Sequence, residues 1–206
     1  DGSEEQLKQR VIQAYQQPFD LKTGPLFRIN LFRRTDEDHV LLITVHHIVF
    51  DAWSGWLLMD EFSKLYSSIT ASQTSNLKPL QHSYRDYIQW QTEILAGAEG
   101  EKLWQYWQKK LAGEIPVLQL PTDRPRPPMQ TFHGATIGFY IDETLTRQLR
   151  ELAREEGTTL FTVLMAAFHV LLYRYTGQDD LLVGTPTGGR DNRDFTGISG
   201  YFVNPV

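Results

Sequence analysis

The stretch VLLITVHHIVFDAWS, residues 40–54, decides the fold of this 206-residue chain. Its first six residues are almost continuously apolar and partly β-branched, which predicts a strand buried on both faces. After Asp51 the spacing becomes helical, and Asp51 or Ser54 can cap the helix that follows. The apolar residues at that spacing are Trp53, Leu57, Leu58, Phe62, Leu65 and Tyr66. The stretch therefore predicts a strand, a turn that carries two histidines, and a helix.

The two histidines are the first candidates for chemistry. Successive side chains of a strand point to opposite faces, so a strand continuing to its end would put His47 on the face of Ile43 and Val45, and His46 on the other. A neutral imidazole suits proton removal from an amine or hydroxyl because its ordinary pKa is ~6.5. From the residues alone, a structural role for both histidines and a capping role for Asp51 stay open.

The flanking sequence predicts α/β organisation. Residues 4–16 have helical periodicity, and Phe27, Ile29 and Leu31 alternate as in a half-buried strand. Two amphipathic helices are expected around Tyr84–Gln91 and Leu103–Leu111. Residues 116–128 contain five prolines, which indicates a stiff connector. We therefore expect one unit over residues 1–115, a connector over 116–133, and a second unit over 134–206.

The second unit is expected to begin with a strand over residues 135–141. A helix containing Leu145 then ends at Gly157, and Thr158 or Thr159 caps a buried helix over residues 160–175. A strand over 181–183 and a Gly-rich loop over 184–193 follow. The chain begins without Met and ends in the apolar YFVNPV, so we expect more protein on both sides.

Composition narrows the function classes. Hydrophobic residues make up 41% of the chain and charged residues 22%, an ordinary globular balance. The net charge of −5 gives no reason to expect nucleic acid, and no apolar run has membrane-spanning length. Without cysteine there is no thiolate ligand or nucleophile, which fits a reducing cytoplasm. The histidines lack metal-ligand spacing, so no metal site is expected.

Three ordered motifs resemble those of condensation domains of nonribosomal peptide synthetases. Residues 46–54, HHIVFDAWS, resemble the His-His-x-x-x-Asp-Gly signature. Residues 84–90, YRDYIQW, and 198–204, ISGYFVN, resemble the next two motifs, and the order and spacing agree from residue 18 onward. The resemblance implies a chloramphenicol-acetyltransferase-like, two-lobed α/β sandwich, incomplete here at both ends. Ala52 replaces the motif glycine, so this turn should keep ordinary dihedrals.

The resemblance also assigns roles. His47 would be the catalytic histidine, either as general base for an attacking amine or as a hydrogen-bonding group that orients the amine and stabilises the tetrahedral intermediate. Asp51 would anchor the histidine loop by an ion pair with Arg190 or with an arginine outside this chain, and His46 would be scaffold. Four more residues are candidates for the tunnel wall, with packing or capping as the alternative: Trp53, Ser54, Tyr201 and Asn204.

The implied reaction is acyltransferase chemistry, in which an amide bond forms between a donor and an acceptor. Both arrive as thioesters on the 4'-phosphopantetheine arms of upstream and downstream peptidyl carrier domains, so the domain needs no bound cofactor. Neighbouring synthetase modules would be partners, and the isolated piece is expected to be inactive. The alternatives are an epimerisation domain, a free-standing acyltransferase, or a non-catalytic platform for recruiting carriers or other partners.

Overall fold

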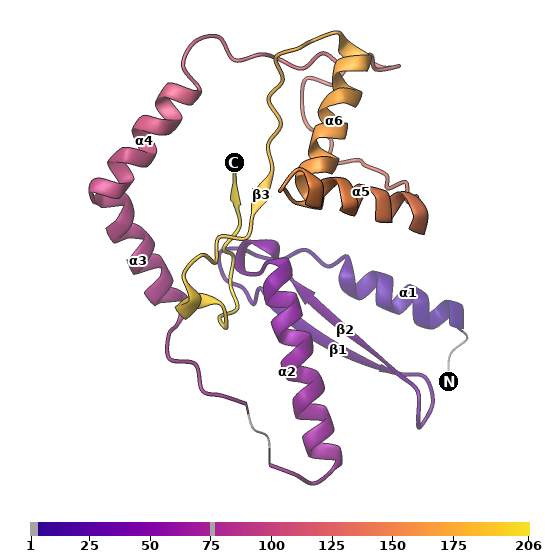
Figure 1. Ribbon diagram of the computed structural model, residues 1–206. Coiled ribbons are helices and arrows are strands. Elements are labelled where there is room, and N and C mark those ends of the chain that lie inside the picture. The colour runs from indigo at the N-terminus through magenta and orange to yellow at the C-terminus, as the bar shows by residue number, and fades with distance from the viewer. Residues whose placement is uncertain (1–3, 75–76) are drawn as a thin grey trace. The chain divides into compact units, whose positions relative to one another are not determined.

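The computed structural model describes residues 4–74 and 77–206 (Figure 1). They form two compact units, one containing the chain up to Gln105 together with Gly184–Val206, the other containing Tyr106–Val183. Residues 184–206, expected in a second lobe, thus pack with the first unit of this chain. The lobe boundaries of a complete domain stay a prediction.

The first unit begins with a helix and a hairpin. Helix α1, Glu4–Tyr15, contacts β1, Phe27–Arg33, and β2, His39–Val45 (Figure 1). The strands pair antiparallel, with Phe27 opposite Val45 and Arg33 opposite His39. In the turn between them, the Thr35 hydroxyl accepts hydrogen bonds from the backbone N–H groups of residues 37 and 38. The predicted helix and both strands are therefore present.

The burial of the hairpin differs from the prediction. Phe27, Ile29 and Leu31 are exposed, whereas Phe32 on the opposite face of β1 is buried under Arg10 of α1. The β2 side chains are half-buried or exposed, so this strand is not buried on both faces. The reason is that the hairpin has two strands, and α1 covers the Phe32 face.

Three helices follow the hairpin. The strand β2 ends at Val45, and the 3₁₀ turn η1, His47–Val49, leads to α2, Ala52–Thr70. Ala52 is the first residue of α2, so the turn keeps ordinary dihedrals as expected. Helix α3, Tyr84–Ala96, begins at a capping box between Ser83 and Asp86, and α4, Ala98–Lys110, comes next.

The end of the chain supplies the core of the first unit. The short strands β3, Pro186–Thr187, and β4, Asn204–Pro205, pair antiparallel, and the 3₁₀ turn η2, Arg193–Phe195, lies between them. A buried cluster joins this segment to α3 and consists of Tyr87, Phe195, Ile198 and Phe202, with Tyr84 and Trp90 packed against it. The Tyr87 and Phe202 ring centroids are 4.3 Å apart. The second and third motifs of the sequence therefore pack on each other.

The second unit consists of two helices and irregular chain. Asp142 caps α5, Glu143–Glu155, which ends two residues before the expected Gly157. Thr159, one of the two expected caps, caps α6, Leu160–Thr176. The side-chain amide of Gln178 accepts from the backbone N–H of Gln119 and donates to the carbonyl of Val117. This pair of hydrogen bonds ties the first residues of the Pro-rich connector to the end of α6.

Two predicted strands are wrong. Residues 135–141 and 181–183 have no strand structure, because no other described backbone pairs with them. The prediction that α6 is buried is also wrong, since Leu172 is its one buried residue and Phe161 and Val170 are more than half exposed. The alternating and apolar patterns are present, but the surfaces that would cover them are not among the described residues.

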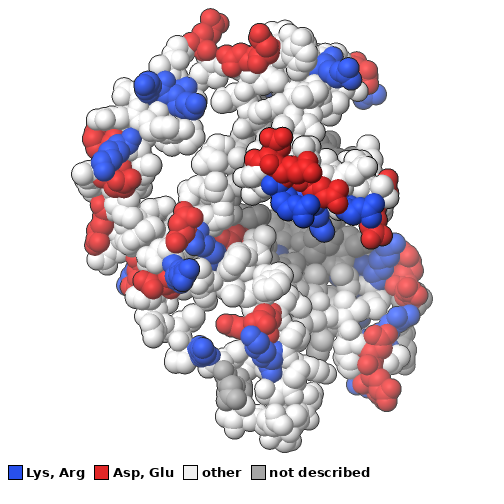
Figure 2. Space-filling view, in the orientation of Figure 1, with Lys and Arg blue, Asp and Glu red and all other residues white. Residues whose placement is uncertain are grey.

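The surface charge and the hydropathy of the helices say little about function. Figure 2 shows acidic and basic side chains intermixed over the face in view. In the described part of the chain no single helix is long and apolar enough to cross a membrane. Helices α5 and α6 meet that test only when taken together, and they are bent by 104°.

Candidate active site

His46 is a capping residue. Its backbone is extended, and its Nδ1 accepts a hydrogen bond of 3.1 Å from the N–H of Ile48, which caps η1. A ring nitrogen that accepts a hydrogen bond carries no proton, so the neutral His46 ring has its proton on Nε2. The ring meets Phe19 edge-on, with centroids 5.8 Å apart. These contacts support the scaffold role expected of His46.

His47 points to a different neighbour. It is exposed, begins η1, and its ring meets that of Tyr201 with centroids 5.7 Å apart and planes at 77°. Strand alternation was expected to separate the two histidines, and this reason was wrong, because the strand ends at Val45 and does not reach them. The 3₁₀ turn, rather than strand alternation, sends the two rings in different directions.

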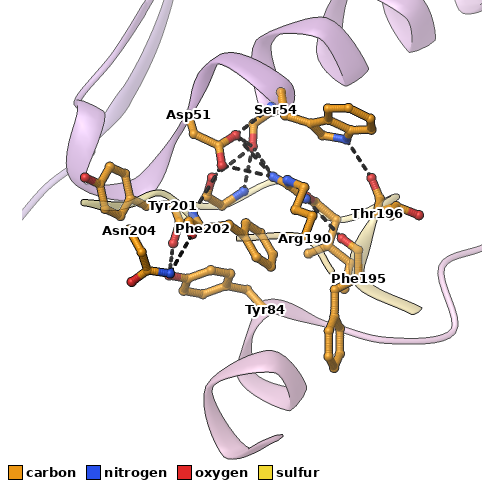
Figure 3. A network of polar contacts seen from close by, with 12 residues as sticks. Asp51, Ser54, Tyr84, Arg190, Phe195, Thr196, Tyr201, Phe202 and Asn204 are labelled. Atoms are coloured by element: carbon orange, nitrogen blue, oxygen red, sulfur yellow. Dashed lines mark hydrogen bonds and ion pairs between the residues drawn. The ribbon is translucent and has the colours of Figure 1, made fainter. Parts of the chain in front are cut away.

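Asp51 is the centre of a buried polar network (Figure 3). Its Oδ1 accepts the N–H and the hydroxyl of Ser54, both at 2.7 Å, so Asp51 is the N-cap of α2. Its Oδ2 accepts the N–H of Phe202 at 3.1 Å. One carboxylate therefore fixes the start of α2 and holds the chain near its other end.

Arg190 is the cation of this network. Its Nη2 donates to Asp51 Oδ1 at 3.1 Å and Oδ2 at 3.2 Å, and its side chain is 5% exposed against 2% for Asp51. The same Nη2 lies 3.0 Å from Ser54 Oγ, while Nη1 donates to the carbonyls of Phe195 and Ile198. The guanidinium carbon is 3.7 Å from the centroid of the Phe202 ring. The predicted Asp51–Arg190 ion pair is thus present within this chain.

Ser54 connects the network to the backbone. It is fully buried, and its Oγ accepts the N–H of Gly200 at 2.9 Å. The Gly200 carbonyl is also 2.9 Å from Oγ, but a hydroxyl has one proton, which goes either to it or to Asp51. Because the side chain has no exposed surface here, Ser54 is a buried link and not part of a tunnel wall.

The other candidates for the tunnel wall remain accessible. Trp53 is 51% exposed, and its Nε1 donates to the carbonyl of Thr196 at 2.8 Å. Tyr201 is exposed beside His47, and Asn204 is exposed in β4, where its Nδ2 donates to the carbonyl of Phe202. Substrate contact by these three residues stays a prediction.

The network determines the charge of Asp51. Burial by itself raises the pKa of this carboxyl, but hydrogen bonds from Ser54 and Phe202 and the charge of Arg190 outweigh it. The pKa of Asp51 therefore lies below its ordinary value, and the residue is a carboxylate near neutral pH. Burial raises the pKa of Tyr84 and of Tyr87, so both phenols stay protonated.

Two glycines and one tyrosine complete the site, and the sequence analysis named none of the three as a site residue. Gly189 has φ +62°, and a Cβ there would collide with the Phe202 carbonyl; one at Gly200 would collide with the Tyr84 ring. The Tyr84 hydroxyl donates to the Tyr201 carbonyl at 2.6 Å. The Gly188-Gly189-Arg190 run was the available signal for close approach. Within the described residues, no cluster of three metal-ligating side chains occurs.

The family model for the condensation domain matches residues 1–206. The chain belongs to the condensation-domain family. The relatives of this condensation-domain chain include tyrocidine synthase 2 of Brevibacillus parabrevis, 42% identical over 100% of the chain. Another is the phosphinothricin tripeptide synthetase PhsB of Streptomyces viridochromogenes, 46% identical over 93% of the chain. The chain spans 6% and 16% of these two relatives, respectively.

Solved structures confirm the fold class. The X-domain from teicoplanin biosynthesis matches 99% of the chain with a TM-score of 0.85 and 28% identity. The epimerization domain from the third module of tyrocidine synthetase B matches all of it with a TM-score of 0.82 and 25% identity. The chain covers 46% and 48% of these two structures. The condensation-domain chain thus has the α/β fold expected from its motifs, over about half the length of these neighbours.

Proposed function

We propose that this chain provides the histidine-bearing part of an acyltransferase that forms amide bonds between carrier-bound thioesters in nonribosomal peptide synthesis. The observation that carries the proposal is the position of His47, exposed at the start of η1 on a loop whose Asp51 is fixed by Arg190. Family membership suggests the reaction in which His47 would act, and the Asp51–Arg190 network holds the loop that carries it.

The chemistry requires one proton to move. The amine nitrogen of the acceptor attacks the donor's thioester carbonyl, so that a C–N bond forms, the C–S bond breaks, and the thiol leaves with a proton. The His47 imidazole either accepts the amine proton and returns it to the thiolate, or hydrogen-bonds the amine and orients it. Holding two tethered reactants together contributes much of the rate in either case.

Asp51 and Arg190 act on this reaction through structure. Both side chains are buried, so neither has surface with which to touch a substrate. The Asp51 carboxylate accepts hydrogen bonds from Ser54, Phe202 and Arg190, and these bonds fix the loop between β2 and α2. We therefore assign Asp51, Arg190 and the capping residue His46 to the support of His47.

The partners follow from the proposed reaction. Donor and acceptor would arrive on 4'-phosphopantetheine arms of upstream and downstream carrier domains, and other synthetase modules would lie beside the domain. The arms belong to the substrates, and the proposal requires no cofactor held by this chain. Residence in the cytoplasm stays a prediction.

Replacement of His47 tests the proposal. In the full-length protein that contains this chain, His47→Ala should greatly slow amide formation between two loaded carrier proteins, measured by mass spectrometry of the carrier-bound product. His39→Ala, which changes an exposed histidine at the start of β2, is the matched control and should keep its rate. Unchanged turnover in His47→Ala would refute the catalytic assignment.

The second candidate is a recruitment platform. The X-domain from teicoplanin biosynthesis, also solved in complex with OxyB, shares this fold and is 28–29% identical to the chain. An intact His47 on an anchored loop argues against a purely non-catalytic role. If His47→Ala kept its rate while the chain bound a partner protein, this candidate would replace the first.

A further inference from the structure

Three consecutive residues, Gly200, Tyr201 and Phe202, have their backbones held by the N-cap of α2 and by side chains of α2 and α3. Ser54 Oγ bonds Gly200, the Tyr84 hydroxyl donates to the Tyr201 carbonyl, and Asp51 Oδ2 accepts the N–H of Phe202 (Figure 3). We call the side chains of Asp51, Ser54 and Tyr84 the backbone clamp.

The clamp leaves one side chain of the three free to act. The Phe202 side chain is 1% exposed in the core, and Gly200 has none. The Tyr201 ring stays partly exposed and meets the His47 ring edge-on, with centroids 5.7 Å apart. In residues 4–74 and 77–206, no hydrogen bond holds the His47 ring, and the Tyr201 ring is its aromatic neighbour.

We infer that Tyr201 is a positioning residue for His47, presented to the imidazole by the backbone clamp. This inference rests on the proposed function, because it assumes that the orientation of His47 matters for turnover. It differs from the expected tunnel-wall role, since Tyr201 acts on the histidine and not on the substrate. The clamp explains why a segment more than 140 residues away can do so: Asp51 ends the His47 loop, and Ser54 lies in the first turn of the helix that follows it.

The expected size of the effect follows from the kind of contact. An exposed imidazole without hydrogen bonds samples several rotamers, and only one directs a given nitrogen toward the substrate. Aromatic pairs of this kind stabilise one arrangement enough to change its population about 2- to 13-fold. Loss of the Tyr201 ring should therefore lower kcat by about 2- to 13-fold, while the KM values for the carrier-bound substrates stay unchanged.

Three variants of the full-length protein separate the possibilities. Tyr201→Leu removes the ring but keeps bulk and the backbone carbonyl that Tyr84 needs. Tyr201→Phe keeps the ring and should restore kcat. Tyr66→Leu is the control, because Tyr66 is also an exposed tyrosine in an aromatic pair, on α2 with Phe62, and should have no effect. In a His47→Ala background, Tyr201→Leu should cause no further loss.

A second readout does not depend on activity. The rate at which diethyl pyrocarbonate modifies His47, followed by peptide mass spectrometry, should rise in Tyr201→Leu, since the ring no longer covers the imidazole. It should stay unchanged in Tyr201→Phe and in Tyr66→Leu. If His47→Ala itself proved fully active, the proposed function would fail, while the modification rates would still report whether Tyr201 restrains the histidine.

Several results would overturn the inference. A raised KM with unchanged kcat would mean that Tyr201 contacts substrate. Equal losses in Tyr201→Leu and Tyr201→Phe would mean that the hydroxyl acts, and a further loss in the His47→Ala background would mean that the effect does not pass through His47. An unchanged rate of His47 modification in Tyr201→Leu would show that the Tyr201 ring does not restrain His47.

Discussion

Removal of Arg190 should destabilise both segments that the buried network joins, the start of α2 and residues 200–202. In Arg190→Ala, Asp51 would keep its charge with no cation beside it, and Ser54 Oγ and the carbonyls of Phe195 and Ile198 would each lose a donor. The guanidinium would also leave the face of Phe202. The structure offers no other described cation that bonds Asp51.

The magnitude comes from burial. The two side chains are 5% and 2% exposed, so solvent screens their interaction little. Breaking a buried pair by removing one partner costs about 3–5 kcal/mol, most of it the penalty of an uncompensated charge. If the region opens by local unfolding, that loss raises the exchange rate of its amides by about two to four orders of magnitude.

Hydrogen exchange of the full-length protein measures this directly. The peptides to follow carry the N–H groups of Ser54, Gly200 and Phe202, which the network holds. Arg193→Ala is the matched control, because Arg193 lies three residues away with an exposed side chain. Arg190→Lys should lie in between, since an ammonium lacks the planar fork that reaches the acceptors on both sides.

Two exchange results would contradict this prediction. If the three amides in Arg190→Ala exchanged at the rate of the Arg193→Ala control, the ion pair would not hold the histidine loop. Exchange that increased in the Ser54 peptide alone would mean that the network does not couple α2 to the chain end.

Two further changes test the same region. Because the pKa of Asp51 lies below its ordinary 3.8, its contribution to stability is fully present above that value and is lost as pH falls through the lower folded-state pKa. Acid should therefore lower the protection of these amides, measured as exchange relative to the intrinsic rate at the same pH, in the native protein and less so in Asp51→Asn; equal acid sensitivity of the protection in both would contradict the assignment. Gly189→Ala should weaken the site by more than about 1 kcal/mol, since φ is +62° and the Phe202 carbonyl blocks a Cβ, whereas Gly188→Ala has open space and should be neutral; equal exchange in the two alanine variants would show that the loop can shift away.

The helices were predicted well because their signals are local. Capping side chains, a change of apolar spacing and a terminal glycine lie within a few residues of the ends they determine, as at Asp51 and Thr159. The failures concern burial and pairing. The alternation around Ile137 is real, but a strand requires a partner backbone, and no described segment supplies one.

The side chains of His46 and His47 point in different directions, as expected, but not for the expected reason. Alternation along a strand was expected to send His46 and His47 to opposite faces, yet the strand stops at Val45. The His46 ring accepts the Ile48 N–H and closes a 3₁₀ turn, and this turn determines where His47 points. Such a side-chain cap competes locally with extended structure, so the apolar run before it could not reveal it.

The sequence by itself determined the family, the order of its motifs and the candidate histidine, because each depends on which residues occur and in what order, but it left two partners open for Asp51. Only the tertiary structure decided that Ser54 is buried, that Tyr201 stands beside His47, and that Gly189 and Gly200 leave no room for a side chain. The contacts of Ser54, Tyr201 and Gly200 join positions more than 100 residues apart, and that of Gly189 joins two backbone segments 13 residues apart. Their geometry arises when the chain end packs on α2 and α3, and no local pattern encodes that packing.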